Sequence, residues 1–264
     1  MQPHLPFFRE AGTGPGVVCT HSNAASSSQW RALMDELSPR FRVFAADSFG
    51  AGKSPAWPKD RQIGLQDEAD LLEPVFQLAG DPFALVGHSY GAAVALIASL
   101  QRPERVRKLA VYEPTMFCLL EQEMPPTDQA SGIRNAVRDA AALIARNDHL
   151  GAARRFIDYW MGDGAWDRMP AERQPAIAAS MINIRNWGEV LFREQTTLDA
   201  FRTLDIPVLY MLGGKTPESA RGVARLLTAA LPNVEVVEFA QLGHMGPVTH
   251  PEVVNPTIAR FLAI

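Results

Sequence analysis

The stretch LVGHSYGAA, residues 85–93, decides the fold class of this chain. An apolar run ends in Gly87-His88-Ser89-Tyr90-Gly91, and an alanine-rich run of helical pattern follows at once. This order predicts a sharp strand-to-helix turn, here called the elbow, that lifts the serine hydroxyl above the edge of a sheet. Ser89 would lie at a helix N-terminus, where partial positive charge favours developing negative charge. We therefore interpret Ser89 as a nucleophile; the alternative is an ordinary glycine-rich turn with a serine N-cap.

Apolar, β-rich runs alternate with helical patterns on both sides of this stretch. Most of the runs are unbroken, which is typical of a parallel sheet covered on both faces. The strand candidates are 16–20, 42–46, 83–86, 108–113, 207–212 and 234–239, with one more in LPFFREAGTGPGVV at the N-terminus. The alternation predicts an α/β fold with a doubly wound, mostly parallel sheet.

The interval 115–200 breaks this alternation because it contains no strand-like run. Apolar residues share helical faces at 133–144 and 153–160, and further helical patterns run near 171–186 and 189–201. We predict a helical cap at 115–200, folded over the sheet edge of a core made of 1–114 and 201–264. Those cap residues that face a pocket would favour an apolar or aromatic substrate group. Because of their helical spacing, we expect most of the candidates to pack within the core or the cap. These candidates are Met116, Phe117, Trp160, Trp166, Met181, Trp187 and Phe192.

Composition excludes several classes of protein. The 264 residues are 47% hydrophobic and 20% charged, as in a globular chain, and the net charge of −4 has the wrong sign for a nucleic-acid surface. The apolar runs are too short to cross a bilayer, and the first residues do not resemble a secretory signal. Cys19 and Cys118 are too few for a disulfide framework. We expect free thiols and a cytoplasmic location.

A serine nucleophile needs a base, and His244 is the candidate among the six histidines. It follows the last strand in the glycine-flanked loop QLGHMG, at the edge where the carboxyl ends of parallel strands converge. His88 lies inside the elbow and His250 precedes the final helix, so we interpret both as structural.

With these motifs in place, nearly the whole chain resembles the α/β-hydrolase family. THSNAASSSQW, residues 20–30, stands where that family carries a His-Gly oxyanion loop, and DSFGAGKS, residues 47–54, resembles its D-x-x-G-x-G-x-S turn. Ser22 replaces the glycine expected after His21. The resemblance implies an oxyanion hole formed by the backbone N–H groups of Tyr90 and Asn23, with Ala24 as the alternative to Asn23.

A catalytic triad also needs an acid that orients the histidine, and two residues of the sequence are candidates for it. The resemblance places an aspartate after the next-to-last strand, but Thr216 stands there. Glu218 lies two residues further on, where it could simply complement a helix dipole. Glu113, in AVYEPTMF at 110–117, ends the strand that follows the elbow helix, and a right-handed crossover brings that strand end beside Ser89. Some family members carry their acid there, and we favour Glu113 over Glu218.

The predicted function is a serine hydrolase that cleaves a small, largely apolar ester through an acyl-enzyme. A carbon–carbon bond hydrolase or an amidase would use the same triad. A non-catalytic ligand receptor of the same fold is the alternative of another class. We expect no metal, no organic cofactor and no nucleic-acid or membrane partner; the expected partners are a small-molecule substrate and a second copy of the chain in a homodimer.

Overall fold

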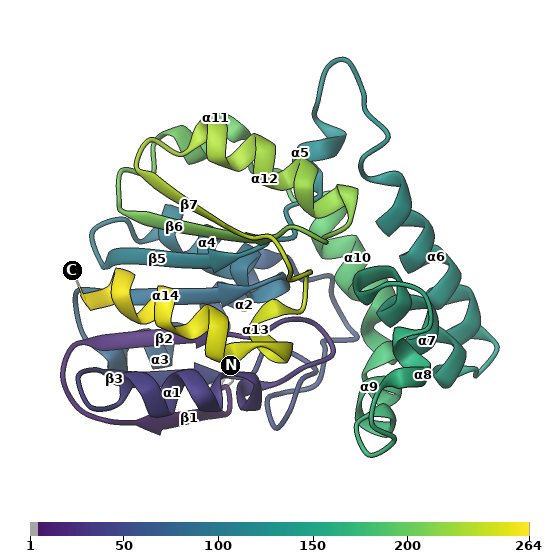
Figure 1. Ribbon diagram of the computed structural model, residues 1–264, viewed down its shortest axis with the longest axis horizontal. Coiled ribbons are helices and arrows are strands. Elements are labelled where there is room, and N and C mark those ends of the chain that lie inside the picture. The colour runs from purple at the N-terminus through teal and green to yellow at the C-terminus, as the bar shows by residue number, and fades with distance from the viewer. Residues whose placement is uncertain (1–4, 264) are drawn as a thin grey trace.

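The computed structural model describes residues 5–263 and contains a seven-stranded sheet with helices on both faces (Figure 1). The strand order is β1-β3-β2-β4-β5-β6-β7, and within it only β1 pairs antiparallel to its neighbour. The doubly wound, mostly parallel sheet predicted from the sequence is confirmed. The strands are β1 Phe8–Ala11, β2 Gly16–Thr20, β3 Arg42–Ala46, β4 Phe83–His88, β5 Val106–Tyr112, β6 Val208–Gly213 and β7 Val234–Phe239.

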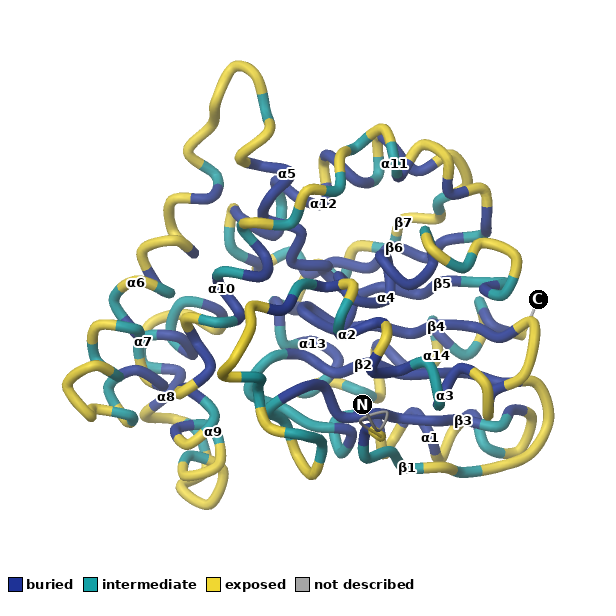
Figure 2. Tube along the Cα trace, turned by 180° about the vertical axis from the view of Figure 1, so that it is seen from behind, coloured by how far each residue is buried: buried dark blue, intermediate teal, exposed yellow. Residues whose placement is uncertain are grey.

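Alternate residues of the central strands pack into two apolar layers. In β2, Val17 and Cys19 pack towards one layer and Val18 towards the other. The first layer is covered by α1 Arg31–Leu37 and α14 Pro251–Ala263. The second is covered by α2 Leu65–Leu71, α3 Glu73–Ala79, α4 Tyr90–Gln101 and α12 Glu218–Ala230. β2 and β4 are buried along their whole length (Figure 2), which explains their unbroken apolar sequences.

Between β5 and β6 the chain forms a set of helices, here called the helical insertion, most of which lies beyond one edge of the sheet (Figure 1). The helices are α5 Cys118–Glu121, α6 Ser131–Ala145, α7 His149–Met161, α8 Ala165–Arg168, α9 Gln174–Ser180, η2 Met181–Asn183, α10 Ile184–Arg193 and α11 Leu198–Arg202. Within residues 5–263, no helix combines the length and apolar character needed to cross a membrane.

The helical pattern near 189–201 is two helices rather than one. The backbone leaves the helix at Glu194, where ψ is 135°. The carboxylate of Glu194 accepts hydrogen bonds from the N–H groups of Gln195 and Thr196 and from the Thr196 hydroxyl, at 2.8–3.0 Å, and so stabilises a turn. The boundary predicted at residue 200 consequently falls inside α11, which lies beside α12 (Figure 1).

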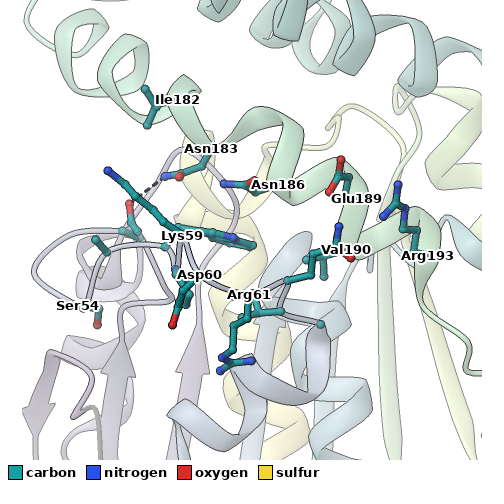
Figure 3. A pocket seen from close by; sticks show the side chains of 18 of the residues that line it. Ser54, Lys59, Asp60, Arg61, Ile182, Asn183, Asn186, Glu189, Val190 and Arg193 are labelled. Carbon is teal, nitrogen blue, oxygen red and sulfur yellow. Dashed lines mark hydrogen bonds between the residues drawn. The ribbon is translucent and has the colours of Figure 1, made fainter.

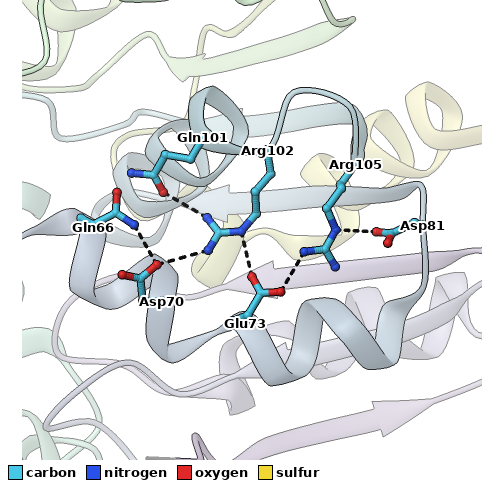
Figure 4. A network of polar contacts seen from close by, with 7 residues as sticks. All are labelled: Gln66, Asp70, Glu73, Asp81, Gln101, Arg102 and Arg105. Carbon is cyan, nitrogen blue, oxygen red and sulfur yellow. Dashed lines mark hydrogen bonds and ion pairs between the residues drawn. The ribbon is translucent and has the colours of Figure 1, made fainter. Parts of the chain in front are cut away.

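A network of ion pairs clamps α2 and α3 to the segment that joins α4 and β5 (Figure 4). Arg102 donates to Glu73 at 2.8 Å and to Asp70 at 3.2 Å. Arg105 donates to Glu73 at 2.8 Å and to Asp81 at 2.6 Å. Burial alone would raise the pKa of Glu73, but hydrogen bonds from Arg105 and Arg102 outweigh it and hold that pKa below its ordinary value. The clamp thus fixes α2 and α3 relative to α4, the helix that begins at the elbow.

Candidate active site

Ser89 stands at a strained turn between β4 and α4, with φ 57° and ψ −117°. The glycines on either side are required by close packing. A Cβ on Gly87 would lie 2.5 Å from the Cα of Ala92, and one on Gly91 would lie 2.4 Å from the carbonyl oxygen of Thr20. The backbone of Gly91 therefore packs directly on the loop that follows β2, and the two loops share one edge of the sheet.

Glu113 stands at the end of β5, beside the elbow. His88 is paired with Tyr112 across the parallel strands, so Ser89 and Glu113 each come one residue after that pair. The N–H of Ser89 donates to the carbonyl of Tyr112 at 2.9 Å. Glu113 has φ 45°, a left-handed conformation that is strained for a residue with a Cβ. Glu113 thus lies beside Ser89, as the right-handed crossover between the two strands predicted.

Ser89, His244 and Glu113 form one hydrogen-bonded chain. The Ser89 hydroxyl donates to Nε2 of His244 at 2.8 Å, and Nδ1–H of His244 donates to Oε2 of Glu113 at 2.6 Å. An ionised carboxylate only accepts hydrogen bonds, so the proton of the neutral imidazole lies on Nδ1 and Nε2 is free to accept. All three residues are buried, with exposed fractions of 5%, 2% and 0%. This arrangement can activate a serine hydroxyl.

The carboxylate of Glu113 has two further donors. Oε1 accepts the N–H of Gly213 at 2.7 Å, and Oε2 accepts the hydroxyl of Thr216 at 2.6 Å. Thr216, which stands where the resembling family usually carries its acid, here donates to the carboxylate of Glu113. Glu218 is exposed at the first residue of α12 and lies outside this network.

Two side chains fix the loop that carries His244. The hydroxyl of Tyr112 donates to the carbonyl of Gly243 at 2.8 Å, and Nε2–H of His88 donates to the carbonyl of His244 at 2.8 Å. Burial, together with the neighbouring His244, holds the pKa of His88 well below its ordinary value. His88 is therefore a neutral, structural side chain beneath the nucleophile, as its position in the elbow suggested.

Ser22, the residue that departs from the family's His-Gly pattern, takes part in a second network. Its N–H and its hydroxyl donate to Oε1 of Gln29 at 3.1 and 3.0 Å. The amide nitrogen of Gln29 donates in turn to Nδ1 of His88 at 3.1 Å. The loop after β2 is thus joined through Gln29 and His88 to the backbone of His244. The role of Gln29 was missed by sequence reasoning, because nothing in the sequence pairs it with His88.

The oxyanion hole was expected to be formed by the backbone N–H groups of Tyr90, the first residue of α4, and of Asn23, in the loop after β2. Within residues 5–263, neither the N–H of Asn23 nor that of Tyr90 donates to another residue, so both are available to a ligand. Backbone strain is concentrated at this site. Among the same residues, the non-glycine positions with positive φ are Ala24, Ser89, Glu113 and Asn147, and the first three belong to this site. Such strain is typical of functional loops.

A groove of about 1130 Å³ lies between the loop 50–64 and the segment made of η2 and α10 (Figure 3). Asn183 bridges its two sides by donating to the carbonyl of Gly50 at 3.4 Å. Charges of both signs line it, including those of Lys59, Arg61 and Glu189. None of the three triad residues lines it, and neither do the seven aromatic and methionine residues named as candidates for a pocket lining.

Those seven residues of the helical insertion pack into the core, as expected for most of them: six are buried and Phe192 is half-buried. Phe117 packs against Phe192 with ring centroids 5.4 Å apart, and against Trp160 at 6.3 Å. Trp160 is the member of the set whose ring stacks on a triad residue, with its centroid 3.7 Å from that of His244. Helical spacing alone could not distinguish Trp160 from the others.

The part of the chain that the structure describes contains no group of three or more histidine, cysteine, aspartate or glutamate side chains placed to hold a metal ion. Its two cysteines are both free and buried.

Comparison with known proteins identifies the family. The profile of the alpha/beta hydrolase fold matches residues 15–251, so the chain belongs to the α/β-hydrolase family, as the sequence motifs suggested. A pimeloyl-[acyl-carrier protein] methyl ester esterase of Nitrosomonas europaea is 24% identical over 249 residues, which cover 91% of this chain and 93% of that protein.

Solved structures agree on the fold. An alpha/beta hydrolase from Sphaerobacter thermophilus has a TM-score of 0.72 and 23% identity, and covers 97% of this chain and 96% of its own. A hydrolase from Oleispira antarctica has a TM-score of 0.79 and 19% identity, covering 97% and 94%. Family and relatives together support a hydrolytic enzyme of the esterase type.

Proposed function

We propose that this protein is a serine hydrolase in which Ser89 is the nucleophile, His244 the general base and Glu113 the orienting acid. The observation that carries the proposal is the continuous chain of hydrogen bonds from the Ser89 hydroxyl through His244 to Glu113, at 2.8 and 2.6 Å. Oγ of Ser89 attacks the substrate carbonyl while Nε2 of His244 takes its proton and then passes it to the leaving group. Water, activated by His244, then releases the acyl group from Ser89.

The developing oxyanion would be held by the backbone N–H groups of Tyr90 and Asn23. Both lack a partner among the described residues, and the strained backbone of Ala24 and Ser89 lies beside them. Donors fixed before the reaction stabilise charge in the transition state without reorganising. Glu113 would keep the proton of neutral His244 on Nδ1 and stabilise the imidazolium that forms during the reaction.

The substrate class is a carboxylic ester with an apolar acyl group. The relative in N. europaea is named for its action on a methyl ester, and Trp160 of the helical insertion places an apolar ring against His244. In this proposal residues 115–200 act as a cap over the triad. Amide or carbon–carbon cleavage, a homodimer and a cytoplasmic location stay predictions. A receptor without catalysis is less well supported, because it would not need a complete and strained triad.

Covalent labelling tests the proposal directly. The protein is treated with a fluorophosphonate probe, and hydrolysis of p-nitrophenyl butyrate is measured in parallel. We expect the wild type to be labelled and active, and Ser89→Ala to lose both properties. Ser180→Ala, in which the serine lost belongs to α9 and bonds only to the carbonyl of Ile177, is the matched control and should keep both. An unlabelled, inactive wild type would favour the receptor.

A further inference from the structure

Trp160, from α7 of the helical insertion, lies flat against the imidazole of His244. The ring centroids are 3.7 Å apart and the planes are inclined by 21°. Both side chains are buried, with exposed fractions of 5% for Trp160 and 2% for His244. We propose that Trp160 is a positioning residue that holds the imidazole by its face and favours its protonated form during the reaction. This inference rests on the proposed role of His244 as the base.

The contact complements the hydrogen bonds of His244. Both nitrogens of the ring are already used by Glu113 and Ser89, so Trp160 adds its contact at the ring face. The face of an indole ring carries negative charge density and attracts a cation within about 6 Å of its centroid. His244 becomes a cation when it accepts the proton of Ser89, and the attraction is stronger at that moment than before it. An interaction that strengthens in the transition state accelerates the reaction.

Few other charges compete at this ring. The carboxyl group of Glu113 contacts the ring at Nδ1, at 2.6 Å. The ring of His88 lies 5.2 Å away and is tilted by 46°, and it stays neutral because burial and His244 hold its pKa well below its ordinary value. The phenols of Tyr112 and Tyr210 also stay neutral, since burial and the charge of Glu113 raise their pKa values. The imidazolium would therefore be stabilised by one carboxylate at its edge and one indole at its face.

Trp160 is itself held in place by its neighbours. Phe117 stacks parallel to it at 6.3 Å, and the rings of Phe156 and Tyr159 meet it edge-on at 6.3 and 5.0 Å. The hydroxyl of Tyr159, the residue before Trp160, is hydrogen-bonded to the hydroxyl of Ser219 at 2.7 Å. This bond ties α7 to the first turn of α12, three residues after Thr216. The indole is thus fixed relative to the same segment that fixes Glu113.

The test replaces Trp160 and measures how kcat and kcat/KM for ester hydrolysis depend on pH. Trp160→Leu keeps an apolar cover over His244 but removes the aromatic face, and Trp160→Phe keeps a weaker one. For Trp160→Leu we expect kcat for p-nitrophenyl butyrate to fall about tenfold with little change in KM, and the acidic limb of kcat/KM to move to lower pH by about 1. Trp160→Phe should lie between wild type and Trp160→Leu.

Trp187→Leu is the matched control. Trp187 is buried in the same insertion, and its ring packs on Phe156 rather than on His244. We expect its acidic limb to coincide with that of the wild type. An unmoved limb in Trp160→Leu, or an equal movement in Trp187→Leu, overturns the inference. Fluorophosphonate labelling of the wild type is done first: without labelling the proposed function itself fails, whereas labelling with an unmoved limb overturns the role of Trp160 alone.

Discussion

At the scale of single residues, the contact between Glu113 and Thr216 shows that two neighbouring strand ends reach the same carboxylate oxygen. The Thr216 hydroxyl lies 2.6 Å from the carboxylate oxygen that accepts His244. Position 216, after β6, and position 113, after β5, thus reach the same point from neighbouring strand ends. A carboxylate at either position could bond to Nδ1 of His244, and the other residue is then free to become a donor.

We therefore predict that the acid can be moved back. Glu113→Gln should lower kcat for p-nitrophenyl butyrate by about 10⁴-fold, because a neutral amide at this position would hold neither the tautomer nor the imidazolium. Adding Thr216→Asp in the same chain should restore at least about tenfold of that loss. Steady-state kinetics of the single and double variants measure this. Glu218→Gln is the control and should stay near wild type; a large loss there, with a small one in Glu113→Gln, would mean that the acid has been misassigned.

At the scale of elements, the contact between the elbow and the loop after β2 leaves no room for a side chain at Gly91. A Cβ there would lie 2.4 Å from the carbonyl oxygen of Thr20 and 2.5 Å from that of His21. We predict that Gly91→Ala destabilises the protein by about 1–3 kcal/mol, since overpacking a buried contact costs that much. It should also lower activity, because relief of the clash displaces the loop that carries Asn23.

Urea unfolding and ester hydrolysis measure both effects. Gly64→Ala is the matched control: apart from the residue itself and its two chain neighbours, no atom lies within 4 Å of the added Cβ, and the change should cost less than about 1 kcal/mol. Equal stability of the two variants would show that the elbow does not depend on this packing.

Most of these elements, but not all of their contacts, could be predicted from the sequence. The strands and the elbow follow from local patterns. The handedness of the crossover places Ser89 beside Glu113, and the parallel order of the strands brings His244 to the same edge. The division between α10 and α11 depends on the side-chain bonds of Glu194, which periodicity does not reveal. The stack of Trp160 on His244 and the bond from Gln29 to His88 join segments far apart in the chain, so only the folded structure identifies them.

At the scale of the whole molecule, the stability of the fold is linked to pH through Glu68 of α2. This side chain has an exposed fraction of 1% and accepts hydrogen bonds from the N–H of Phe49 at 3.1 Å and the hydroxyl of Tyr90 at 3.0 Å. Burial outweighs these bonds and raises the pKa of Glu68 from 4.5 to about 7. The carboxyl group thus joins the turn after β3 to the elbow, and its charge is unfavourable in the folded chain.

The sign of the pH effect follows from this shift. Between pH 4.5 and about 7 the folded chain holds a proton on Glu68 that the unfolded chain has released, so the free energy of unfolding falls as pH rises through this window. The contribution is roughly 3 kcal/mol. Glu68→Gln lacks this titration, and its stability relative to the wild type should improve by about that amount from pH 4.5 to pH 7.5.

Urea unfolding at both pH values measures the difference. Glu36→Gln, in which an exposed carboxylate of α1 is neutralised, is the matched control and should keep a constant offset from the wild type across the same window. If the curve for Glu68→Gln also runs parallel to the wild type, then Glu68 is ionised in the folded protein throughout. Its bonds to Phe49 and Tyr90 would in that case outweigh its burial.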